Sequence, residues 1–71
     1  MSPSKTFAQR FHEVRQSKKK LNGRPMSLYD VAVMLNVHVA TVSGWEHARQ
    51  LPDARSREAI SQKWPEVFSN A

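Results

Sequence analysis

Turn-forming residues divide the chain into four segments, each with room for a single helix. The breaks fall at Asn22-Gly23, Pro25, Asn36, Leu51-Pro52 and Pro65. Between the breaks, apolar residues recur every three or four positions, the period of an amphipathic helix. We therefore predict an all-α bundle with helices at residues 6–19, 27–35, 38–47 and 53–64, and no strand within residues 27–47. A short fifth helix in the tail would be compatible with this pattern.

Each predicted segment begins with a residue that can cap a helix. Thr6 followed by Gln9 has the form of a capping box, in which each side chain bonds the other residue's backbone. Ser27 and Asp53 are good N-caps, whereas His38 is an unusual one. The predicted helix starts therefore rest on side-chain chemistry as well as on hydrophobic period.

The 71 residues suffice for one domain, with an ordered core at about residues 6–68. So short a chain leaves little room for a substrate cavity, and no group of residues assigns a nucleophile and a base. The chain has no cysteine, and His12, His38 and His47 lack metal-ligand spacing. We expect no enzyme activity, no metal, no cofactor and no small-molecule ligand.

The sequence also indicates where in the cell we expect to find the protein. No apolar run approaches the ~20 residues that span a bilayer, and the N-terminus lacks the apolar segment of a signal peptide. We expect a soluble, cytoplasmic protein associated with the nucleoid and not with a membrane.

Positive charge is concentrated in the first third of the chain. The net charge is +5; residues 1–26 hold seven Lys or Arg and one acid, and the remaining residues hold four and five. This asymmetry is typical of a protein with a polyanionic partner, although a solvated surface would have the same composition.

Two short helices joined by three or four residues describe a helix-turn-helix. Residues 26–52 resemble the Xre family of lambda-type repressors and Cro proteins. The matches are Ser27, Ala32, Leu35, Val37, Thr41, Ser43, Trp45, Glu46 and Pro52. The resemblance covers about residues 6–64. It implies a lambda-repressor-like bundle that binds double-stranded DNA and regulates transcription in a sequence-specific manner. Such a protein is either a repressor or a Cro-like switch, encoded by a phage or plasmid.

The chain departs from the family pattern at several positions. Leu28 replaces a Gln that often holds a phosphate, and Asn36 replaces the turn Gly but tolerates a left-handed backbone. Ala48 replaces the Gly after the third helix, so we expect that helix to continue further. The connection between the first two helices is longer than is typical of the family.

The third helix, residues 38–47, is the predicted recognition helix for the DNA major groove. If Val42 and Trp45 point inward, small residues form its exposed outer face. The predicted base contacts are Val39, Ala40, Ser43 and Gly44. The predicted phosphate contacts are Lys20, Arg24, Ser27, Thr41, His47 and Arg49.

Arg15 and Glu46 occupy positions where the family carries an Arg and a Glu, so the resemblance implies an ion pair between them. The alternative is two independent surface charges.

Three large apolar residues near the chain end, Trp64, Val67 and Phe68, have two interpretations. In the first interpretation they form a homodimer surface together with the fourth helix. In the second they cover the core of a monomer.

The outer face of the third helix lacks the Arg, Asn and Gln side chains that make bidentate base contacts. A second hypothesis is therefore a protein-interaction module, an antirepressor or adaptor, that uses this face on a protein partner.

Overall fold

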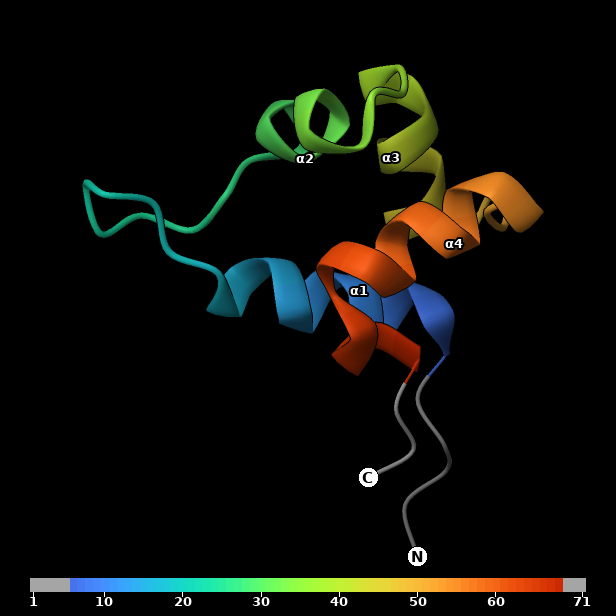
Figure 1. Cartoon of the computed structure of the whole chain (residues 1–71), viewed down its shortest axis with the longest axis horizontal. Coiled ribbons are helices and arrows are strands. Elements are labelled where there is room, and N and C mark those ends of the chain that lie inside the picture. Colours follow the sequence, from blue (N-terminus) through green and yellow to red (C-terminus); the bar gives the residue numbers. More distant parts are fainter. Residues whose placement is uncertain (1–5, 69–71) are drawn as a thin grey trace, which may run out of the picture.

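The computed structural model describes residues 6–68 and is all-α in its regular elements, as predicted (Figure 1). The elements are α1 (Phe7–Ser17), α2 (Leu28–Leu35), α3 (Val39–Glu46), α4 (Ala54–Lys63) and the short 3-10 helix η1 (Pro65–Phe68). Residues 27–47 contain no strand. None of the helices in the described part of the chain combines the length and apolar character needed to cross a bilayer.

The predicted caps begin the helices. At α1, the Gln9 backbone N–H donates to the Thr6 hydroxyl at 3.2 Å and the Thr6 N–H donates to the Gln9 side chain at 3.0 Å. Ser27 begins α2 with a second capping box. His38 does cap α3, since its Nδ1 accepts from the Ala40 N–H at 3.1 Å. These bonds satisfy donors that a helix start otherwise leaves unpaired.

Aromatic rings join the helices in the core. Phe11 of α1 is fully buried and contacts Trp45 of α3 edge-on, with ring centroids 5.7 Å apart. The same ring lies 5.5 Å from the ring of Trp64. Helix α1 packs against α3 and η1, and α2 packs against α3 and α4. Helices α2 and α3 therefore contact each other, while α1 supports α3 and α4 supports α2.

The tail residues support the second interpretation of the sequence. Trp64 and Val67 are buried in the core, with 4% and 1% of their surface exposed, and Phe68 packs against it. The Phe68 ring stacks on Phe7 at 5.8 Å. Trp64 and Val67 are thus already buried within one chain. The homodimer stays a prediction, with less exposed apolar surface for a second copy of the chain to contact.

Helix α1 is shorter than predicted. It ends at Ser17, and Lys18 is extended with φ −89° and ψ 106°. The next residue, Lys19, forms an antiparallel bridge with Pro25. The chain leaves the helix early because residues 18–26 form a hairpin of their own, visible as the loop that projects from the bundle in Figure 1.

Candidate nucleic-acid interface

Three residues separate α2 from α3. Asn36 ends α2 with φ 57° and ψ 47°, the left-handed conformation expected of it. The next N–H, from Val37, donates to the Ala32 carbonyl at 3.0 Å. This bond pattern is typical of a left-handed helix end, and it reverses the chain so that α3 begins beside α2.

The N-terminal half of α3 presents small side chains to solvent. Val39 is 37% exposed, Ala40 is exposed and Ser43 is half-buried, whereas Val42 and Trp45 lie in the core. Three of the four predicted base-contact residues therefore lie on the accessible side of the helix.

The prediction that Gly44 lies exposed on this face is wrong. Gly44 is buried, and a Cβ atom there would lie 2.7 Å from Nε2 and 2.9 Å from Cγ of Gln50. The Gln50 side chain lies over the glycine and its Nε2 donates to the Thr41 carbonyl at 3.3 Å. Glycine at this position thus makes room for the returning chain, which periodicity alone did not indicate.

The expectation that α3 continues past its usual end is also wrong. The helix ends at Glu46, and Ala48 has φ 58°, in the region that favours glycine. The Arg49 N–H then donates to the Gly44 carbonyl at 2.9 Å. This turn closes the C-terminus of α3 and leaves Arg49 exposed directly after it.

A nearly buried ion pair holds the end of α3, and the pairing of its two residues was predicted. Arg15 Nε donates to Glu46 Oε1 at 2.9 Å, and the two side chains are only 11% and 6% exposed. The same oxygen lies 3.0 Å from Nδ1 of His12. Arg15 also donates to the Met26 carbonyl at 2.7 Å. The pair therefore fixes α3 relative to α1 and to the residues that lead into α2.

The predicted phosphate contacts Lys20 and Ser27 lie together near the start of α2. Lys20 Nζ is 3.2 Å from Asp30 Oδ2, and the Ser27 hydroxyl accepts from the Asp30 N–H at 3.1 Å. The Ser27 N–H donates to the Asp30 carboxylate, and this bond, with the ammonium of Lys20, lowers the carboxyl's pKa. Lys20 thus has an acid partner in place, and its two other donor hydrogens are available to a phosphate.

The other predicted phosphate contacts differ in accessibility. Arg24, His47 and Arg49 are exposed, and Thr41 is half-buried. His47 lies back along its own helix, with Nδ1 2.8 Å from the Ser43 carbonyl and 3.2 Å from the Ser43 hydroxyl. This bond orients the imidazole and leaves its Nε2 edge for an external partner.

Two exposed apolar residues of α2 were missed by the sequence analysis. Tyr29 is 66% and Val33 is 63% exposed, and both line a hollow of about 380 Å³ that reaches Val37, His38 and Val39. We call Tyr29, Val33 and Val39 the α2–α3 apolar patch. The four-residue spacing of Tyr29 and Val33, on the side of α2 opposite its core residues, is the signal that could have identified it.

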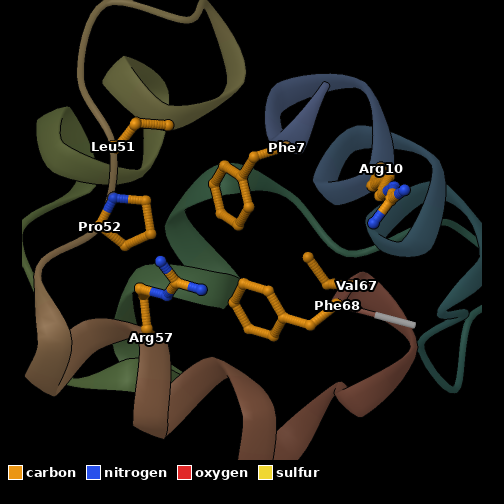
Figure 2. A pocket seen from close by; sticks show the side chains of 7 residues that line it. All are labelled: Phe7, Arg10, Leu51, Pro52, Arg57, Val67 and Phe68. Atoms are coloured by element: carbon orange, nitrogen blue, oxygen red, sulfur yellow. The ribbon is translucent and has the colours of Figure 1, made fainter. Parts of the chain in front are cut away.

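A smaller pocket of about 220 Å³ lies between the start of α1, the segment after α3 and η1 (Figure 2). Its lining is Phe7, Arg10, Leu51, Pro52, Arg57, Val67 and Phe68. The Arg57 guanidinium lies 5.3 Å from the centre of the Phe68 ring, within cation–π range. None of the predicted DNA-contact residues lines it, so this pocket is separate from the candidate interface.

Comparisons of the chain with protein-family models, with curated proteins and with solved structures found no match. Within residues 6–68, no three His, Asp or Glu side chains are grouped so that they could hold a metal ion.

Proposed function

We propose that this protein is a helix-turn-helix regulator that binds double-stranded DNA in a sequence-specific manner, with α3 in the major groove. The observation that carries the proposal is the exposed N-terminal half of α3, held on a fixed support beside α2. A helix fits the major groove of B-DNA, and its first turns then meet the base edges.

Sequence preference in this proposal comes from Val39, Ala40 and Ser43. Methyl groups of Val and Ala pack against the thymine methyl, and a serine hydroxyl donates to or accepts from base edges. Exposed cations that follow α3 or precede α2 in the chain supply the affinity, because phosphate contacts position a protein without reading the sequence. Arg49 follows α3, and Lys20 and Arg24 precede α2.

A second function is favoured by the α2–α3 apolar patch. Tyr29 and Val33 expose large apolar side chains beside the candidate recognition helix. An apolar surface of this kind also suits a protein partner, which would make the chain an antirepressor or adaptor.

Selection of bound sequences from a pool of random duplexes tests the first proposal. We expect enrichment of a defined motif and an affinity that falls steeply as salt rises, because each phosphate contact releases counterions. Binding with no enriched motif would contradict sequence-specific recognition. Absence of duplex binding, together with salt-insensitive binding to a protein, would favour the second function.

A further inference from the structure

Residues 18–26 form a structured hairpin, which we call the basic hairpin. Its two arms are joined by hydrogen bonds from the Lys20 N–H to the Arg24 carbonyl at 2.8 Å and from the Met26 N–H to the Lys18 carbonyl at 3.0 Å. Gly23 closes the tip with φ 81°, a conformation that glycine adopts without steric cost. The hairpin is thus held by its own backbone bonds before any partner binds.

Both arms of the hairpin are anchored to the helices. Lys18 pairs with Glu66 of η1, and Lys20 pairs with Asp30 of α2. On the second arm, the Met26 carbonyl accepts from the buried Arg15 side chain. The position of the hairpin is therefore fixed relative to α2 and, through Arg15 and Glu46, relative to α3.

The tip of the hairpin presents an apolar side chain between cations. Leu21 is fully exposed. Lys19 and Arg24, also exposed, form no ion pair within residues 6–68. A single exposed leucine is ordinary on a protein surface. The combination of an exposed leucine and exposed cations on one hairpin matches proteins that place an apolar wedge and basic side chains in the DNA minor groove.

The hairpin lengthens the described part of the molecule. The longest dimension is 37 Å, and the hairpin stands at one end of that axis, beyond the start of α2 (Figure 1). One turn of B-DNA is about 34 Å, so a major groove and the next minor groove are about half that distance apart. A molecule of this length can reach both grooves.

We propose that the basic hairpin occupies the minor groove next to the major groove that receives α3. In this arrangement Leu21 contacts the base edges or sugars, and Lys19 and Arg24 contact phosphates on the two sides of the groove. This inference rests on the proposed DNA-binding function and extends it, because it gives the protein a second contact element outside the helix-turn-helix.

The test uses the full chain and a duplex selected by the wild type from random DNA. Hydroxyl-radical cleavage, which reports on sugars along the minor groove, is combined with binding titrations at about 50 to 200 mM salt. The variants are the double substitution Lys19→Ala/Arg24→Ala and the single substitution Leu21→Ser. Lys63→Ala, an exposed lysine in the last turn of α4, is the matched control. Circular dichroism checks that each variant keeps its helices.

In a plot of log affinity against log salt concentration, we expect the slope of the double variant to be smaller by roughly two units. Its affinity at 0.15 M salt should be about thirtyfold lower, the effect of two phosphate contacts. It should also lose protection of one minor-groove segment while the remaining protection persists. Leu21→Ser should weaken binding with no change in slope, and the control should match the wild type.

Two other results would overturn different parts of the account of DNA binding. If the hairpin variants show the slope, affinity and protection of the wild type, the hairpin contact and the phosphate contact of Arg24 are overturned, whereas the placement of α3 in the major groove stands. If the wild type itself protects no duplex, the hairpin contact and the proposed function are both overturned.

Discussion

Arg15 and Glu46 lie 31 positions apart in the chain, and their side chains meet at 2.9 Å in a nearly buried ion pair. Arg15 belongs to α1 and Glu46 is the last residue of α3. Because Arg15 also binds the Met26 carbonyl, a single guanidinium joins the supporting helix, the end of the candidate recognition helix and the base of the hairpin. The orientation of α3 thus depends on a contact far from its exposed face.

Removing either partner of this pair should destabilise the fold strongly. Removing one partner of a buried pair typically costs about 3–5 kcal/mol. Glu46→Ala leaves the Arg15 guanidinium without its carboxylate, whereas in Arg15→Ala the Glu46 carboxylate keeps its contact with His12. Urea denaturation measures the effect. Lys18→Ala, which breaks the more exposed pair with Glu66, is the control and should cost less than about 1 kcal/mol. The ion pair would lose its structural importance if the Arg15 and Lys18 variants were equally stable.

Gly44 and Gln50 should be coupled energetically. Alanine favours a helix over glycine by about 1 kcal/mol, but a Cβ at position 44 displaces the Gln50 side chain. Gly44→Ala should therefore give little or no stabilisation in the wild type. In a Gln50→Ala background it should stabilise by about 1 kcal/mol. Equal effects of Gly44→Ala in the two backgrounds, measured by denaturation, would show that the two residues are not in contact.

Asp30 should contribute to the dependence of stability on pH. Its pKa lies below the ordinary value of 3.8, chiefly because the Ser27 N–H donates to it. A carboxyl with a lowered folded pKa stabilises the protein above its unfolded pKa, and this contribution is lost as the pH falls through the folded pKa. Asp30→Asn should be less stable than the wild type at neutral pH. Below about pH 4, the urea midpoint of this variant should also change less with pH than that of the wild type does. Parallel curves of urea midpoint against pH for the two proteins would contradict this role of Asp30.

Arg49 and Val39 should affect DNA binding in different ways. Arg49→Ala should weaken binding to all sequences alike and lower the salt slope by roughly one unit, as expected for a phosphate contact. Val39→Ala should leave the slope unchanged and lose about 1 kcal/mol of preference, mostly at one thymine. Titrations against the selected duplex and its single-base variants separate the two effects. A change of slope in the Val39 variant would contradict its assignment as a base contact.

The helices could be predicted from the sequence because each depends on residues close together in the chain. Ser27 and Asp53 begin helices through their own side chains, and Asn36 ends α2 with a local left-handed turn. The Arg15–Glu46 pair was predicted through family resemblance, since nothing local relates residues 31 positions apart.

The surroundings of α3 were harder to predict because they depend on the path of the chain after the helix. Gly44 appeared exposed when only the helix period was considered, but Gln50 returns over it. Ala48 takes a positive φ that alanine does not favour, and this turn ends α3. The hairpin likewise depends on pairing between Lys19 and Pro25, which a search for helical periodicity does not detect.

Ala40→Glu tests the placement of α3 against DNA, on which the proposed function depends most directly. Ala40 is exposed in the first turn of α3, where an acidic residue suits the helix dipole, so the fold should be retained. Ser61→Glu, at an exposed position of α4, is the matched control. Titration of the selected duplex should show a loss of about a hundredfold for Ala40→Glu, because like charges opposed across an interface cost several kcal/mol. The control should bind as the wild type does, whereas wild-type affinity in the Ala40 variant would contradict the presence of α3 in the groove.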